Sequence, residues 1–184
     1  WLFDEVYAAA GTTMAEHVAL RQLEPGYRIF WTGEERHFDF GSDRDRLREE
    51  MRRFSADDAA RLDAFLAASG AIHREGILVA GRRSFLGLGD FVKLLPTMAR
   101  LDAIRFLEGW VAKYFREPHV QQAFGFHSLF IGGDPARVPA IYSALAYLQV
   151  ADGIWYSEGG VYAVVESFGK LIRQLGGTIL NRAK

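Results

Sequence analysis

The 184-residue chain contains no cysteine, and this absence excludes several kinds of chemistry. Without thiols the chain can form no disulfide, no thiolate zinc site, no iron–sulfur cluster and no cysteine nucleophile. Its 22 basic and 23 acidic residues give a formal net charge of −1, which provides no overall attraction to nucleic acid. We therefore expect no nucleic-acid partner, and the lack of cysteine fits a cytoplasmic protein.

The sequence also lacks an apolar run suited to crossing a membrane. The longest stretches without charge are residues 118–133, which hold two histidines and two glutamines, and residues 138–151. The second is shorter than the ~20 residues that a spanning helix needs. Asp4 and Glu5 stand where a signal peptide would carry basic residues.

Familiar site motifs are missing as well. There is no G-x-S-x-G elbow and no Walker loop, and Gly87-Leu88-Gly89 starts a dinucleotide-like pattern that fails because Val92 occupies the third glycine position. The histidines show no metal-ligand spacing, so we expect no metal site. These histidines are His17, His37, His73, His119 and His127.

What the sequence does contain predicts a folded α+β protein, predominantly helical with a small antiparallel sheet. Hydrophobic residues make up 49% and charged residues 24% of the chain, as in globular domains. Alternation predicts a three-strand meander, and Ser42 and Ser55 each precede a helical segment as caps. The expected strands are 17–23, 27–31, 36–40, 153–156 and 178–180, and further helices are expected at 2–10, 120–130, 138–150 and 161–175.

The ends of the chain suggest an internal piece of a larger protein. Trp1 stands first, and no capping residue precedes the helix expected at 2–10. The other end stops just as the strand at 178–180 begins, and a lone strand needs a partner sheet.

Two features leave alternatives open. Residues 85–115 are rich in apolar side chains flanked by basic ones, which is typical either of a segment lying on a membrane surface or of buried helices whose arginines reach water. Asp90 follows Gly89 at the head of a helix, where it could act as a general acid or base or serve only as the helix N-cap. The mixed charges of residues 34–61 indicate a solvated helical face.

A set of short motifs in constant order resembles the bacterial-type phytoene desaturases. Each motif alone is weak, but together they run along nearly the whole chain. The similar stretches are Pro25-Gly26-Tyr27-Arg28, Phe54 to Asp58, Phe85 to Asp90, Glu117 to Leu129, Ile131 to Pro135, Ile141 to Leu145, Gly153 to Gly160 and Lys170 to Asn181.

The resemblance implies a fragment of an FAD-dependent oxidoreductase of carotenoid biosynthesis. Such a flavoprotein introduces double bonds into a C40 or C30 isoprenoid and has a fold like that of the amine oxidases. Residues 1–184 would form its substrate-binding and helical cap region, and most of the FAD site would lie elsewhere. Residues 1–41 would supply a small sheet portion, residues 42–152 the helical cap, and residues 153–184 the return toward the FAD domain.

The resemblance also implies site residues. Asp90 falls on an aspartate proposed as a catalytic acid or base in the family, and Lys93 lies one helical turn further on, where it could pair with Asp90. Gly159 and Gly160 could allow close approach to the flavin. The candidate substrate-binding residues are Phe124, Phe126, His127, Trp155 and Tyr156.

Three positions depart from the family pattern and leave the identity of the carotenoid open. Gly89 replaces an arginine, Ser157 a proline and Glu158 a basic residue. The implied partners are a lipophilic isoprenoid and a membrane surface, with the protein peripherally attached on the cytoplasmic side. The alternative is a non-catalytic lipid- or partner-binding helical module derived from the same family, and the fragment alone is expected to be inactive.

Overall fold

The computed structural model describes residues 2–82, 84 and 87–181, and the chain divides into two compact units. The larger unit comprises residues 24–154, and the smaller unit comprises residues 1–23 and 155–184. Each unit has a hydrophobic core of its own. Helices dominate and the strands form two small sheets, which confirms the α+β class.

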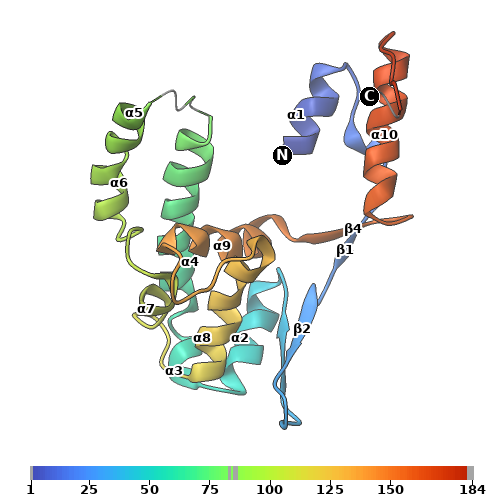
Figure 1. The fold of residues 1–184 in the computed structure, drawn as a ribbon. Coiled ribbons are helices and arrows are strands. Elements are labelled where there is room, and N and C mark those ends of the chain that lie inside the picture. Colours follow the sequence, from blue (N-terminus) through green and yellow to red (C-terminus); the bar gives the residue numbers. More distant parts are fainter. Residues whose placement is uncertain (1, 83, 85–86, 182–184) are drawn as a thin grey trace. The chain divides into compact units, whose positions relative to one another are not determined.

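Figure 1 shows the elements of both units in sequence colours. The larger unit holds β2 (Tyr27–Phe30), β3 (His37–Phe40), α2 (Arg44–Arg52), α3 (Ala56–Ala59), α4 (Leu62–His73), the π-helix η2 (Arg74–Ala80), α5 (Leu88–Val92), α6 (Leu95–Arg100), α7 (Leu107–Val111), α8 (Pro118–Gly125), the 3₁₀ helices η3 (Phe126–Ile131) and η4 (Ala140–Tyr142), and α9 (Ser143–Asp152). The smaller unit holds α1 (Leu2–Ala9), η1 (Met14–Glu16), β1 (Leu20–Leu23), α10 (Val161–Gln174) and most of β4 (Ile154–Ser157).

The strands pair differently from the predicted meander. β2 pairs antiparallel with β3 in a register that places Tyr27 opposite Phe40 and Ile29 opposite Phe38. β1 pairs with β4 instead of β2, so the prediction of one three-strand sheet over residues 17–40 is wrong. Alternation identifies a strand but not its partner, since pairing depends on which faces are buried. Residues 178–180 form no strand, and they have no partner strand in the part of the chain that the structure describes.

The helix caps follow the sequence with one shift. Ser55 caps α3 and accepts a hydrogen bond from the amide of Asp58, as predicted. The cap of α2 is Asp43 rather than Ser42, and its carboxylate accepts from the amides of Asp45 and Arg46. Ser42 was a wrong choice because its own amide and hydroxyl bind the Glu24 carboxylate.

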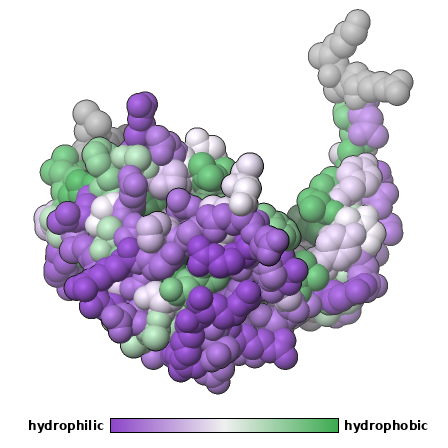
Figure 2. Space-filling model, turned by 90° about the horizontal axis from the view of Figure 1, so that it is seen from below, coloured by the Kyte–Doolittle hydropathy of each residue, from purple (hydrophilic) through white to green (hydrophobic). Residues whose placement is uncertain are grey.

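One face of α2 is charged. Arginine–carboxylate pairs at spacing i, i+3 run along the helix, including Arg48 with Asp45 and Arg53 with Glu50. Figure 2 shows a mostly hydrophilic surface on the side where α2 and α3 lie. The mixed charges of this segment therefore form a solvated face, as the sequence indicates.

Aromatic side chains fill the core of the larger unit. Phe124 of α8 is fully buried, and the centroid of its ring lies 4.8 Å from that of Phe115, 5.0 Å from that of Phe65 and 5.4 Å from that of Phe40. These rings come from α4, α8, the β hairpin and the segment after α7. Burying such rings is worth roughly 2–3 kcal/mol each, so this cluster joins the hairpin to the helices.

The apolar segment 85–115 divides into two parts. In its second half Leu107, Trp110, Val111 and Phe115 are buried, as expected for core helices. In its first half Val92 and Leu95 are exposed on α5 and α6, which lie beside η2 in Figure 1. Phe85 and Leu86 lie outside the described residues.

The smaller unit is organised around Tyr7 of α1. The Tyr7 ring stacks on Phe168 of α10, with ring centroids 5.3 Å apart. Its hydroxyl donates to the hydroxyl of Ser167, which in turn donates to the carbonyl of Val164. One buried side chain thus ties α1 to α10 by both packing and hydrogen bonding.

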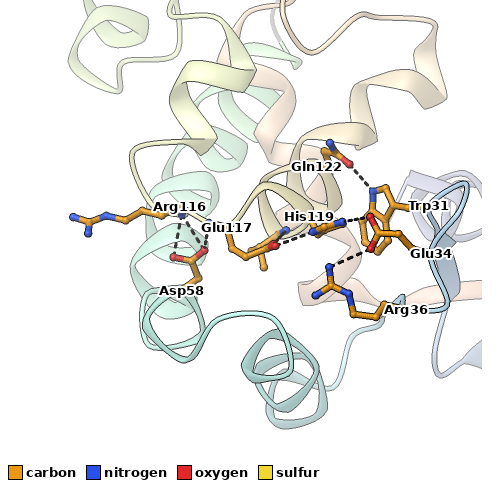
Figure 3. A network of polar contacts seen from close by, with 9 residues as sticks. Trp31, Glu34, Arg36, Asp58, Arg116, Glu117, His119 and Gln122 are labelled. Atoms are coloured by element: carbon orange, nitrogen blue, oxygen red, sulfur yellow. Dashed lines mark hydrogen bonds and ion pairs between the residues drawn. The ribbon is translucent and has the colours of Figure 1, made fainter.

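Asp58 anchors the start of α8 within the larger unit. Its side chain is fully buried, and its carboxylate accepts two hydrogen bonds from the amide of Arg116, at 2.9 and 3.0 Å, and one at 2.8 Å from the amide of Glu117. Figure 3 shows Asp58 facing these two residues from α3. A buried carboxylate bound by backbone amides stabilises the fold only while all of them stay paired.

We predict that Asp58→Ala lowers the free energy of unfolding by about 3 kcal/mol, because the amides of Arg116 and Glu117 lose their buried acceptor. Asp58→Asn keeps one acceptor oxygen and should cost about 1 kcal/mol. Urea denaturation measures both. Asp57→Ala, at the exposed neighbouring position, is the control and should change stability by less than about 0.5 kcal/mol. Equal effects at positions 57 and 58 would contradict the anchoring role.

Candidate functional site

A groove of about 880 Å³ opens on the larger unit between the β hairpin and α8. Its size is in the range of small-molecule sites. The floor and walls come from four stretches that are distant in sequence. The lining residues are Tyr27, Arg28, Ile29, Trp31, Glu108, Pro118, Gln121, Gln122, Gly125, Phe126, Leu129, Phe130, Asp134, Pro135 and Ala136.

One wall of the groove is aromatic. The Tyr27 ring meets Phe126 and Phe130 edge to face, with ring centroids 5.4 and 6.1 Å apart, and stacks on the buried Phe40 at 5.3 Å. Phe130 is 57% exposed, so a large apolar surface remains open to a ligand. Edge-to-face packing of this kind fixes the orientation of the rings.

Behind this wall lies a polar triad of Tyr27, His127 and Gln149, of which His127 is fully buried and the other two are partly buried. The Tyr27 hydroxyl donates to Gln149 Oε1 at 2.8 Å, and His127 Nε2 lies 2.7 Å from the same hydroxyl. Because the hydroxyl has a single hydrogen, Nε2 of His127 is the donor in the second bond. Burial lowers the pKa of His127 to about 4 and raises the pKa of Tyr27 above its usual range. Both groups are therefore neutral over the physiological pH range.

Several polar side chains along the groove are bound to protein partners. Arg28 makes a bidentate pair with Asp39, at 2.6 and 2.8 Å. Gln121 donates through Nε2 to the carbonyl of Phe115, and Gln122 accepts through Oε1 from the Trp31 indole. The groove therefore presents mainly aromatic and aliphatic surface to a ligand.

A network of charges supports the Trp31 end of the groove (Figure 3). His119 Nδ1 lies 2.7 Å from Glu117 Oε1, and His119 Nε2 lies 2.9 Å from Glu34 Oε1. Arg36 also pairs with Glu34. The ring of Trp31 meets His119 edge-on, with centroids 4.5 Å apart. The hairpin loop is thereby fastened to the beginning of α8.

The predicted substrate residues take different positions. Phe126 lines the groove. Phe124 and His127 are fully buried behind it and are not among the residues that line the groove. Trp155 and Tyr156 are about half exposed on β4 and belong to the smaller unit.

Asp90 and Lys93 form the predicted pair, with Lys93 Nζ 3.2 Å from Asp90 Oδ1. Helix α5 begins at Leu88, so Asp90 lies within its first turn and is not its N-cap. Asp90 lines neither the groove nor a second, apolar pocket of about 380 Å³ between η2, α6 and η4. Leu94, four residues after Asp90, does line that pocket.

Gly159 and Gly160 precede α10 with φ angles of +84° and +83°, which strongly favour glycine. A Cβ built at Gly160 would meet no atom within 4 Å. Gly160 is also the N-cap of α10, and no side chain caps that helix end. The two glycines thus leave open backbone at a helix N-terminus.

Four residues of the site were not predicted as functional: Tyr27, Trp31, Phe130 and His119. A weak signal existed for Tyr27, which stands in a motif of the resemblance and in an alternating strand. Nothing in the local pattern connects Trp31 with His119, because the two are 88 residues apart and meet only through folding.

Known proteins share the similarity that the sequence motifs indicate. No protein-family model matches the chain. The chain is 34% identical over 98% of its length to a lycopene-forming phytoene desaturase of Pantoea ananas. It is 32% identical over 94% of its length to a neurosporene-forming phytoene desaturase of Rhodobacter capsulatus, and 31% identical over 96% to a hydroxyneurosporene desaturase of Rubrivivax gelatinosus.

The chain covers 37%, 33% and 34% of these proteins, so it spans about a third of the length of the curated relatives it matches. The identities over nearly the whole chain confirm the resemblance to the phytoene desaturases.

We predict that the His119 network makes stability depend on pH. Glu117 and then Glu34 raise the pKa of His119 by hydrogen bonding. Its contribution is therefore complete below the unfolded-state pKa of about 6.5 and is lost as pH rises through the higher folded-state pKa. Free energies of unfolding, measured between about pH 5 and 9, should fall over this window.

The variant His119→Gln serves as the reference, since it cannot titrate and its profile over the same window should be flatter. His37→Gln, on β3 of the same hairpin, controls for loss of a histidine in general. A wild-type profile that matches that of His119→Gln would refute the prediction.

Proposed function

We propose, from the similarity of this chain to the phytoene desaturases, that it forms the substrate-binding and helical cap region of an FAD-dependent carotenoid desaturase. The observation that carries the proposal is the aromatic-walled groove of about 880 Å³ on the larger unit. In that enzyme the groove binds part of a C40 or C30 isoprenoid. The remaining two thirds of the relatives' length would supply the rest of an amine-oxidase-like fold.

The chemistry of the groove supports a hydrocarbon ligand. Isoprenoids offer methyl groups and extended carbon chains, which gain most from aromatic and aliphatic surface. Tyr27, Phe126 and Phe130 provide such surface, and the Tyr27 hydroxyl is turned away to buried partners. We assign Phe126 to substrate contact, with Phe124 and His127 behind the wall. On the smaller unit, Trp155 and Tyr156 of β4 are separate candidates for substrate contact.

Desaturation removes a proton from one carbon of a CH2–CH2 unit and a hydride equivalent from the neighbouring carbon. FAD, when bound, supplies the acceptor for the hydride equivalent. The paired glycines before α10 fit the approach of a flat, anionic cofactor, since they leave open space and uncapped amides. We assign Gly159 and Gly160 to that contact.

Asp90 is our candidate for the group that holds the proton. Its assignment is supported by the family resemblance and by its ion pair with Lys93 at 3.2 Å. In this role Asp90 accepts the proton that leaves the isoprenoid carbon, and Lys93 keeps the carboxylate oriented.

A membrane surface is the proposed source of the substrate. Val79 of η2, Val92 of α5 and Leu95 of α6 are exposed apolar side chains, and the basic residues Lys93 and Arg100 lie on the same stretch. Within the described residues, no helix has both the length and the apolar character needed to cross a bilayer. We propose peripheral attachment through this stretch on the cytoplasmic side.

We predict that the complete natural polypeptide containing this chain, loaded with FAD, converts phytoene in liposomes to more unsaturated carotenoids. Phe126→Ala should raise KM for phytoene about tenfold, because a buried aromatic contact is lost at the groove. Product absorption spectra and chromatography provide the measurement. Phe30→Ala, at an exposed hairpin position outside the groove, is the matched control and should leave KM unchanged.

Absence of any desaturated product from a folded, flavin-loaded enzyme refutes the proposed function. Equal effects of Phe126→Ala and Phe30→Ala refute only the assignment of the groove.

We predict that Asp90→Asn lowers kcat by about 100-fold or more, since the amide cannot accept the proton. KM should change little, because Asp90 lies outside the groove lining. Asp134→Asn is the control, a carboxylate-to-amide change at the groove rim. A wild-type kcat in Asp90→Asn would show that Asp90 holds no proton in the reaction.

A further inference from the structure

His127 occupies an unusual place for a residue first expected to bind substrate. It is fully buried, whereas its neighbours Phe126 and Phe130 face the groove. All three lie on η3, a segment only six residues long. Since a short 3₁₀ segment has few backbone bonds to fix its rotation, an inward anchor decides which side chains face outward.

The anchor is the hydrogen bond from His127 Nε2 to the Tyr27 hydroxyl at 2.7 Å. That hydroxyl is held on its other side by Gln149 of α9. The Tyr27 ring is clamped between Phe40 beneath it and the edges of Phe126 and Phe130. Two hydrogen bonds to one hydroxyl therefore connect the hairpin, η3 and α9 at the back of the aromatic wall.

Loss of the hydrogen bond between His127 and Tyr27 is expected to weaken the structure behind the aromatic wall. Loss of the His127 donor removes one of the two bonds that hold the Tyr27 hydroxyl and leaves Gln149 to hold it alone. The ring of Tyr27 and the rotation of η3 are then held by packing alone. The wall keeps its residues but loses its fixed geometry.

We propose that His127 is a positioning residue that sets the aromatic wall of the groove through Tyr27, and that it affects isoprenoid binding without touching the isoprenoid. This inference rests on the proposed function and assigns to His127 a different role from that of a substrate contact. The bond fixes the hydrogen of His127 on Nε2, because the single hydrogen of the Tyr27 hydroxyl is used by Gln149.

The test measures kcat and KM for phytoene in the complete FAD-loaded enzyme carrying changes at positions 127 and 27. His127→Leu removes the donor, and His127→Gln returns an N–H close to the position of Nε2. Tyr27→Phe removes the hydroxyl but keeps the ring at the groove. We expect His127→Leu and Tyr27→Phe each to raise KM about tenfold with kcat within about twofold of wild type, and His127→Gln to recover most of the loss.

The double variant His127→Leu/Tyr27→Phe distinguishes positioning from independent effects. If His127 acts through Tyr27, the double variant should raise KM no more than either single variant. If the two increases multiply, the residues act separately and the inference is wrong. His37→Gln is the matched control, because this histidine lies on β3 outside the groove lining and outside the triad.

Other outcomes are equally decisive. A folded His127→Leu enzyme with wild-type KM overturns the inference, as does a fall in kcat at constant KM. If His127→Leu fails to fold, Tyr27→Phe and His127→Gln decide: wild-type KM in Tyr27→Phe, or no recovery in His127→Gln, overturns it. If the wild-type enzyme converts no phytoene, the proposed function fails, and retention of phytoene by the same purified variants still tests the positioning role.

Discussion

The packing of aromatic rings around Phe124 is the constraint on which the larger unit depends. The ring centroids of Phe40 in the hairpin, Phe65 of α4 and Phe115 lie 5.4, 5.0 and 4.8 Å from that of Phe124. A hairpin of four-residue strands is marginal in isolation, so its position comes from this contact. Once the hairpin is fixed against α8, Tyr27 and Trp31 are held in the positions where they line the groove. The groove is thus a consequence of how the core is filled.

Polar contacts then fix the positions of the segments that the aromatic core brings together. Asp58 binds the amides of Arg116 and Glu117 just before α8, and His119 fastens the same helix to the hairpin loop. His127 secures the segment that follows α8. Each of these groups is a short-range device at a helix end or a loop, where backbone geometry is least determined by regular hydrogen bonding. Together they hold both sides of the groove along the length of α8.

Local features of the fold could be predicted from the sequence, and long-range ones could not. The cap at Ser55 and the pair of Asp90 with Lys93 depend on residues within four positions of each other. The partner of β1 depends instead on β4, more than 130 residues later, and alternation carries no information about that choice. The shift of the α2 cap from Ser42 to Asp43 has a similar origin. The Ser42 hydroxyl donates to the carboxylate of Glu24, 18 residues earlier in the chain.

The candidate site shows the same division. Phe126 could be assigned from the resemblance because it lies within a motif, and the groove confirms that it is accessible. His127 was placed in the same group of residues, although burial decides between contact and support and a single sequence does not report burial. Tyr27 was missed because its partners Gln149 and His127 lie about 100 or more residues away.

The register of the β2–β3 hairpin limits how this chain can change through evolution. Tyr27 and Ile29 face the same side as Phe40 and Phe38, whereas Arg28 lies opposite Asp39 on the other side. Insertions within the loop that joins the strands leave this arrangement intact. A one-residue slip within either strand exchanges the two faces and turns Arg28 toward the aromatic core. Variation in loop length should therefore be tolerated among descendants of this sequence, while a single inserted or deleted residue inside β2 or β3 should be eliminated by selection.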